Sequence, residues 1–181
     1  MIDPQDSGPA DDEPTVIILP DAAAVAAEAA RLVAETLQAA GEARGRVDFA
    51  TTGGSTPVAI YPLLARDPLR ALVPWEHLHL WWSDDRFVPR DHPLSNVQPA
   101  ESVLLRVAAW SGESGQGVQG DDIDAGLTEG VWLPPQNVHP FPCTEAIARD
   151  VGPEWCAAAY DALLRASGIR QAGDWPVFDL M

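Results

Sequence analysis

The segment TTGGSTP places two glycines, two hydroxyl side chains and a proline between a strand pattern and a helix pattern. Gly53 and Gly54 permit a sharp turn because they lack a Cβ. Ser55 and Thr56 are good N-cap residues, and Pro57 suits the first helical position. A helix start presents free N–H groups and a partial positive charge, so we expect an anion such as a phosphate to bind here. The alternative is an ordinary strand-to-helix turn with a well-made cap.

A second polar group follows the apolar run LHLWW, where Asp84, Asp85 and Arg86 stand directly after the predicted strand. A guanidinium at this position is able to hold a phosphate or a carboxylate through two hydrogen bonds. One of the aspartates would orient it or hold a sugar hydroxyl. The alternative is a solvated, charged turn.

The histidines give no pattern typical of a metal site. His77 and His79 are two apart in a predicted strand and would share a face, but no carboxylate or cysteine stands at ligand spacing. His92 lies in a polar loop, and His139 is interpreted as structural. Ser55 stands outside any G-x-S-x-G elbow, so a role as hydrogen-bond donor suits it better than a role as nucleophile.

The composition excludes several classes of chemistry. There are 27 acidic residues against 11 basic ones in 181, a net charge of −16, which disfavours nucleic acid and anionic lipid as partners. All the basic residues are arginine, so Schiff-base and P-loop lysines are excluded within this chain. Cys143, expected in a loop, and Cys156, expected in a helix core, do not make a disulfide framework.

The first 14 residues carry acids and no base, and they lack the positive start and apolar middle of a signal peptide. We therefore expect a disordered acidic tail, followed by one domain over residues 15–181, and a cytoplasmic location. The chain contains no apolar run of membrane-spanning length.

Apolar periodicity predicts an alternation of strands and helices, which is typical of an α/β fold with a mostly parallel sheet. Strands are expected at residues 16–19, 47–52, 78–82, 137–141 and 176–181, and helices at residues 21–41, 57–66, 99–107 and 153–167. Residues 111–130, rich in Gly, Ser and Asp, are expected to form a flexible insertion. Ligands bind at the carboxyl ends of parallel strands, where TTGGSTP and SDDR both lie.

The sequence predicts the ends of the first long helix and the buried residues of the first and last long helices. Asp21 should cap the first helix and Gly41 should end it. The expected buried stripe of the first helix is Val25, Ala29, Leu32, Val33 and Leu37. The inward residues expected in the last helix are Trp155, Ala159, Tyr160, Leu163 and Leu164.

Taken in order along the chain, TTGGSTP, WWSDDRFVPRDHPLSN, NVHPFP, CAAAYDALLR and PVFDLM resemble the 6-phosphogluconolactonase family. GGSTP alone also occurs in related hexosamine-6-phosphate isomerases, and the joint order with DDRFVP and SN carries the resemblance. It implies a Rossmann-like three-layer fold and hydrolysis of 6-phospho-D-glucono-1,5-lactone to 6-phosphogluconate in the pentose phosphate pathway. No metal or cofactor is implied.

The resemblance also assigns roles to matched positions. Arg86 would supply positive charge to the substrate and Asp84 would organise the site. The substrate-binding residues would be Gly53, Gly54, Ser55, Thr56, Arg86, Ser95 and Asn96.

Two departures from the family pattern stand out. Asp85 occupies a position where the family usually has glutamate. PVFDLM resembles the start of the strand that enters a G-M-G-x-D-G-H motif, but Met181 precedes that motif, and its histidine, the family's general base, has no counterpart. We therefore expect an amino-terminal portion with weak or no activity, since a general base contributes roughly 10²–10⁴-fold.

Two other functions remain open on the sequence alone. One is a hexosamine-6-phosphate isomerase or deaminase, which would use the same GGSTP turn. The other is a non-catalytic module that binds a sugar phosphate.

Overall fold

The computed structural model describes residues 15–105 and 130–181. The predicted acidic tail and all but the last residue of the predicted insertion lie outside these ranges. The described chain forms a three-stranded parallel sheet in the order β1 (Val47–Thr51), β2 (Leu78–Trp82) and β3 (Val138–His139). Its register pairs Phe49 with Leu80 and Trp81 with His139. The predicted strands at these positions are confirmed.

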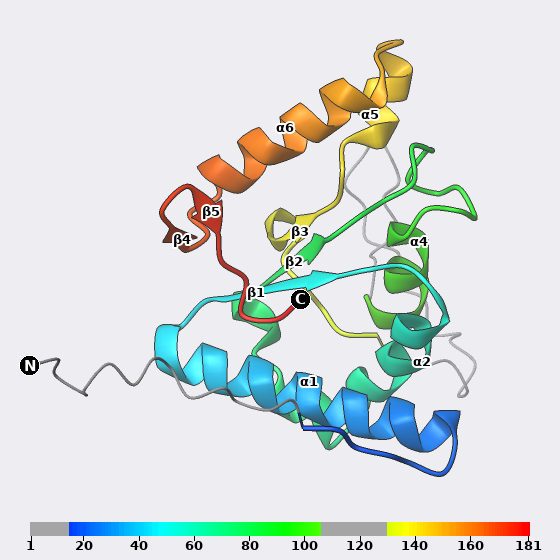
Figure 1. The fold of residues 1–181 in the computed structure, drawn as a ribbon, viewed down its shortest axis with the longest axis vertical. Coiled ribbons are helices and arrows are strands. Elements are labelled where there is room, and N and C mark those ends of the chain that lie inside the picture. The colour runs from blue at the N-terminus through cyan, green and yellow to red at the C-terminus, as the bar shows by residue number, and fades with distance from the viewer. Residues whose placement is uncertain (1–14, 106–129) are drawn as a thin grey trace, which may run out of the picture.

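Side-chain alternation along the strands assigns each helix to a face of the sheet, because successive side chains point to opposite faces. Val47, Phe49, Leu78, Leu80 and Trp82 belong to the core shared with α1 (Ala22–Arg44) and α2 (Ser55–Leu64). The intervening Ala50 and Trp81 pack on the other face, against Tyr160 of α6 (Pro153–Ala166). The three layers are visible in Figure 1, where α1 and α6 lie on opposite sides of the strands. The predicted α/β fold is confirmed.

The first helix has the predicted cap, but its buried face differs from the prediction. The N–H of Ala24 donates to Asp21 Oδ1 at 2.8 Å, which confirms the cap. Val25 and Leu32 are 45% and 42% exposed, and the buried residues are Ala26, Ala30, Ala34, Leu37 and Ala40. The prediction is confirmed for Leu37 and wrong for Val25 and Leu32. It followed the larger side chains, whereas the helix packs its small alanine face inward.

The end of α1 is also later than predicted. The helix passes through Gly41 and ends at Arg44, with Gly45 at a φ of 69° as its C-cap. Gly41 has a packing role instead, since a Cβ there would lie 2.7 Å from Pro74 Cγ. Gly45, and not Gly41, therefore takes the left-handed conformation that ends the helix.

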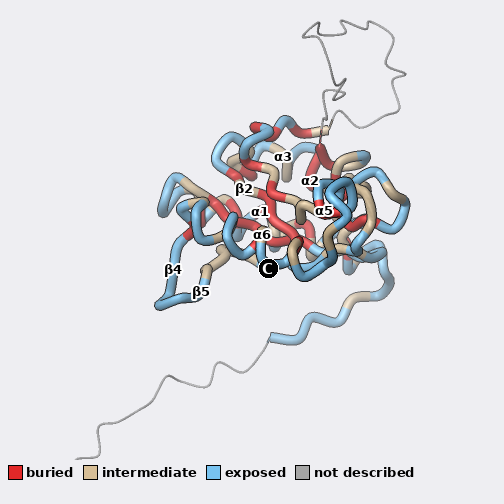
Figure 2. Tube along the Cα trace, turned by 90° about the horizontal axis from the view of Figure 1, so that it is seen from above, coloured by how far each residue is buried: buried red, intermediate tan, exposed pale blue. Residues whose placement is uncertain are grey.

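Two predicted strands differ from the structure. Residues 16–19 form no strand, and Val16 and Ile18 are 78% and 90% exposed. Near the other end, only Leu180 bridges Phe49 in parallel, beside β1. The preceding residues turn back into the exposed hairpin of β4 (Gln171–Ala172) and β5 (Trp175–Pro176), which is pale blue and tan in Figure 2. The glycine at 173, with a φ of 60°, permits that turn.

The remaining elements are short. They are α3 (Leu69–Leu72), η1 (Trp75–His77), α4 (Val97–Pro99), a π-helical turn η2 (Ala100–Leu104), η3 (Pro135–Asn137) and α5 (Cys143–Ala148). The helix predicted over residues 99–107 therefore begins at Val97 as α4 and continues as η2, and residues 106 and 107 lie outside the description.

Three predicted positions are corrected by these short elements. His77 belongs to η1 and is exposed, so it does not share a strand face with His79. Cys143 lies in α5, where its Sγ is 3.3 Å from that of Cys156. In α6 the buried residues are Cys156 and Tyr160, whereas Leu163 is 38% exposed. Among the described residues we find no helix with the length and apolar character that a bilayer crossing needs.

Candidate functional site

The turn from β1 into α2 begins at the carboxyl end of the sheet. Gly54 is the N-cap of α2, with a φ of 107°, a backbone conformation that favours glycine. The helix begins at Ser55, two residues earlier than Pro57, and no side chain caps it. The prediction that Ser55 or Thr56 is the N-cap was therefore wrong. Both side chains are exposed in the first turn, whose N–H groups have no side-chain partner.

Gly53 has a different role, because a side chain from the next loop lies against it. A Cβ on Gly53 would lie 1.8 Å from Oδ1 of Asn96. Asn96 is itself buried, so it has little freedom to move away. The absence of a side chain at Gly53 therefore lets two segments, 43 residues apart in sequence, meet at one point.

Asp85 holds together the loop that follows β2. Its Oδ1 accepts hydrogen bonds from the backbone N–H groups of Arg86 and Asn96, both at 2.8 Å. The hydroxyl of Ser95 lies 3.5 Å from its Oδ2 and accepts from the N–H of Val97 at 3.1 Å. The shorter aspartate therefore spans the loop at a position where the resemblance leads one to expect glutamate.

Asp84 links the loop to the end of β1. Its Oδ1 accepts from the hydroxyl of Thr52 at 2.7 Å, and its backbone carbonyl accepts from Nδ2 of Asn96 at 3.1 Å. The indole Nε1 of Trp82 donates to the backbone carbonyl of Asn96 at 3.0 Å. Side-chain hydrogen bonds therefore join the ends of β1 and β2 to the Asn96 segment.

The structure brings together Gly53, Asp84, Asp85, Ser95 and Asn96. Arg86 is exposed, and its guanidinium forms no hydrogen bond or ion pair with the residues that the structure describes. Its backbone holds it in the loop: its N–H donates to Oδ1 of Asp85, and its carbonyl accepts from the N–H of Val88, both at 2.8 Å. Such a guanidinium keeps all its donors available for a ligand.

Sequence reasoning singled out Asp85 but missed Thr52 and Tyr61 as supporting residues. Thr52 had a sequence signal, since polar side chains directly after a buried strand commonly bond to nearby backbone or loop groups. The buried hydroxyl of Tyr61 lies 2.9 Å from the hydroxyl of Thr51. Burial raises the pKa of Tyr61, so this phenol stays protonated and acts as a neutral part of the scaffold.

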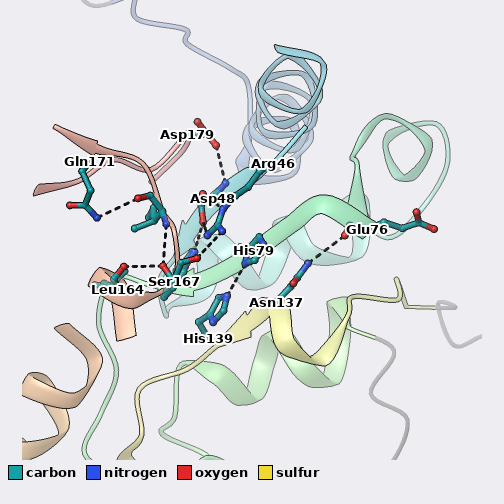
Figure 3. A network of polar contacts seen from close by, with 12 residues as sticks. Arg46, Asp48, Glu76, His79, Asn137, His139, Leu164, Ser167, Gln171 and Asp179 are labelled. Carbon is teal, nitrogen blue, oxygen red and sulfur yellow. Dashed lines mark hydrogen bonds and ion pairs between the residues drawn. The ribbon is translucent and has the colours of Figure 1, made fainter. Parts of the chain in front are cut away.

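A second polar cluster lies on the α6 face, toward the amino ends of the strands (Figure 3). Arg46 donates to Asp48 through Nε at 2.8 Å and through Nη2 at 2.7 Å, and Trp81 Nε1 donates to Asp48 at 3.0 Å. Nδ1 of His79 lies 2.9 Å from Nε2 of His139. The interpretation of His139 as structural fits this pairing.

Within the described ranges, no group of three or more His, Cys, Asp or Glu residues is placed to hold a metal ion. His92 accepts from the N–H of Leu94 at 3.1 Å, within its own loop. No described imidazole contacts the first turn of α2 or Asp84. The residues gathered at the carboxyl end thus offer N–H groups, hydroxyls and one guanidinium, which are donors suited to an anion.

Comparisons with known proteins identify the family of the chain. The family described as glucosamine-6-phosphate isomerases/6-phosphogluconolactonase matches residues 20–181. The chain is 30% identical over 167 residues to a 6-phosphogluconolactonase of Nostoc sp., covering 92% of this chain and 56% of the relative. It is 34% identical over 138 residues to a 6-phosphogluconolactonase of Synechocystis sp., covering 76% and 44%.

Among solved structures, the 6-phosphogluconolactonase of Trypanosoma cruzi superposes with a TM-score of 0.65 at 22% identity, over 93% of this chain and 57% of that one. At that identity the likeness shows the fold alone. The chain spans about half the length of the curated relatives that it matches. The match over residues 20–181 covers most of the sequence, and the chain belongs to the glucosamine-6-phosphate isomerase and 6-phosphogluconolactonase family.

Proposed function

We propose that the carboxyl-end site binds the phosphoryl group of a sugar phosphate, and that the chain serves in the hydrolysis of 6-phospho-D-glucono-1,5-lactone to 6-phosphogluconate. The observation that carries the proposal is the uncapped first turn of α2, held against the loop after β2 by the contact of Gly53 with Asn96. The names of the relatives supply the substrate class. As the resemblance implies, the proposal includes a cytoplasmic location.

The site's contribution to that reaction is binding and orientation. The N–H groups of the first turn and the hydroxyls of Ser55 and Thr56 face a phosphate, and the partial positive charge of the helix start favours it. The guanidinium of Arg86 adds a full charge. In a chain with a net charge of −16, such local groups are needed for an anionic substrate to approach.

Hydrolysis itself requires water to add to the lactone carbonyl and the ring ester bond to break, with a proton passing to the released hydroxyl. Among the described residues Asp84 already accepts from Thr52, and Asp85 already accepts from two backbone N–H groups. Both carboxylates therefore organise the loop. We assign the site the role of holding the phosphorylated end of the substrate.

The test measures binding of 6-phosphogluconate, the stable product, by calorimetry. We expect R86A to weaken binding about 10- to 100-fold, because a hydrogen-bonded charge is lost. R66A is the matched control. Arg66 is also exposed, its guanidinium forms no hydrogen bond or ion pair with a described residue, and it lies beyond the C-terminal end of α2. Gluconate without the phosphate should bind far more weakly than 6-phosphogluconate.

Equal affinity for gluconate, or an unchanged affinity in R86A, would contradict the proposal. Because the family also contains glucosamine-6-phosphate isomerases, glucosamine 6-phosphate serves as the competing ligand. Hydrolysis of the lactone by the purified chain, corrected for spontaneous ring opening, then measures activity apart from binding.

A further inference from the structure

The hydroxyl of Tyr160, on α6, lies between the carboxyl ends of β2 and β3. It accepts a hydrogen bond from the N–H of Trp82 at 3.0 Å. Its own hydrogen is within reach of two backbone carbonyls, that of Trp82 at 3.1 Å and that of His139 at 3.2 Å. Tyr160 is 5% exposed and Trp82 is 1% exposed, so water does not substitute for these contacts.

The sequence explains why a side chain is needed there. Pairing between β2 and β3 ends at Trp81 and His139. The next residue along β3 is Pro140, which has no N–H to donate to a ladder. The backbone N–H and C=O of Trp82 are buried and require partners. One phenol hydroxyl, which both donates and accepts, serves both groups.

Packing fixes the ring of Tyr160 in this position. The ring stacks on Phe141 with centroids 3.8 Å apart and meets the edge of Trp81 at 6.1 Å. Burial raises the pKa of Tyr160 well above its ordinary value. The hydroxyl therefore keeps its hydrogen and both of its roles at any physiological pH.

Trp82 transmits this constraint to the candidate site. It is the last residue of β2, and Asp84 follows two positions later. Its indole also donates to the carbonyl of Asn96, the residue that packs on Gly53. The backbone of Trp82 is thus held by Tyr160 of α6, while its side chain holds the loop that packs on the turn before α2. Figure 1 shows α6 and α2 on opposite sides of the strands.

We propose that Tyr160 is a positioning residue for the candidate site: its hydroxyl fixes the end of β2, and with it Asp84, Arg86 and Asn96 relative to the first turn of α2. One test of this role, the affinity for 6-phosphogluconate, rests on the proposed function. A second test, the amide exchange and chemical shifts of the free protein, does not, so failure of the positioning role is distinguishable from failure of the proposed function.

The test compares Y160F with S167A. Phenylalanine keeps the ring and its stacking and removes the hydroxyl alone. S167A removes a hydroxyl just past the C-terminal end of α6. There Ser167 Oγ donates to the carbonyl of Leu164 at 2.9 Å and accepts from the N–H of Ile169 at 3.3 Å. Below the unfolding transition of both variants, we expect Y160F to weaken 6-phosphogluconate binding about 5- to 100-fold, the effect of one unsatisfied buried N–H. S167A should bind as the wild type does.

Amide hydrogen exchange and amide chemical shifts give the readout that needs no ligand. In the wild type the amide of Trp82 should be protected, and in Y160F it should exchange faster. Shifts in Y160F should extend to the amides of Asp84, Arg86 and Asn96, and shifts in S167A should not. If the wild type binds no sugar phosphate, the proposed function fails and these shifts alone decide the positioning role.

Three results would overturn the inference. An unprotected Trp82 amide in the wild type is one, and it requires no variant to fold. A second is a set of amide shift changes in Y160F that is confined to β2 and does not reach Asp84, Arg86 or Asn96. The third is a lower melting temperature in Y160F with unchanged affinity, since that describes a residue that stabilises the fold without positioning the site.

Discussion

The charged groups at the two ends of the sheet differ in whether they have partners. Toward the amino ends, the two buried carboxylates are paired with arginines: Arg46 pairs with Asp48 (Figure 3). Arg44 and Arg170 both pair with Asp179. At the carboxyl ends, Arg86 has no described partner and the first turn of α2 has no cap. Satisfied charges stabilise the fold, and unsatisfied ones remain available to a ligand.

Burial explains this division. The side chains of Asp48 and Asp179 are 6% and 5% exposed, so each of these carboxylates requires a compensating cation. Arg86 is exposed and loses little by remaining without a partner. The same residue type is therefore structural at one end of the sheet and a candidate ligand-binding group at the other.

The largest expected effect comes from R46Q at the amino end. The substitution leaves the buried carboxylate of Asp48 without its cation, and we expect a loss of about 3 kcal/mol in the free energy of unfolding. Urea denaturation measures it. R165Q is the control, because Arg165 forms an exposed ion pair with Asp161 and its loss should leave the urea midpoint nearly unchanged. A similar midpoint for both variants would remove the distinction between the two ends.

The histidine pair at the amino end should make stability depend on pH. Burial, followed by the neighbouring His79 and Arg46, lowers the pKa of His139 from 6.5 to about 4, against an opposing effect of Asp48. Burial also lowers the pKa of His79. The unfolded chain therefore binds more protons below about pH 6.5.

The sign follows from that difference. The stabilisation is fully present above pH 6.5 and is lost as the pH falls toward 4, by about 2–3 kcal/mol in the free energy of unfolding for His139. Urea midpoints between pH 7.5 and pH 4.5 measure the loss, and the imidazole signal of His139 in NMR assigns it. An NMR titration midpoint near 6.5 for His139 would show that the pair is not held neutral.

At the carboxyl end, G53A should displace the loop while G54A should not. A Cβ at Gly53 overlaps the buried amide of Asn96, and we expect a cost of about 1–3 kcal/mol. A Cβ at Gly54 meets no atom within 4 Å and strains only the local backbone, whose φ is 107°. Amide shifts at Asp84 and Asn96 should therefore change in G53A far more than in G54A. Equal shifts would mean that Asn96 is free to yield.

Local signals were enough to predict the main strands and the glycine turn, because the apolar run at residues 78–82 and the pair of glycines specify short-range geometry. The first turn of α2 was placed two residues late because Gly54 was interpreted as part of the turn and not as the cap. In the predicted stripe of α1, Leu37 is buried but Val25 and Leu32 are exposed, because the prediction gave side-chain size more weight than close packing. The contacts of Tyr160 and Asp85 depend on residues up to 78 positions away, which no local pattern records.

The smallest expected effect on stability is that of R86Q, the counterpart of R46Q at the other end of the sheet. With no described partner to lose, the substitution should change the free energy of unfolding by less than about 0.5 kcal/mol. If R86Q loses 6-phosphogluconate binding with an unchanged urea midpoint, the guanidinium of Arg86 serves ligand binding and not the stability of the fold. A loss of stability comparable to that of R46Q would instead show that Arg86 supports the fold, because only a group already engaged in the free protein can destabilise it when removed.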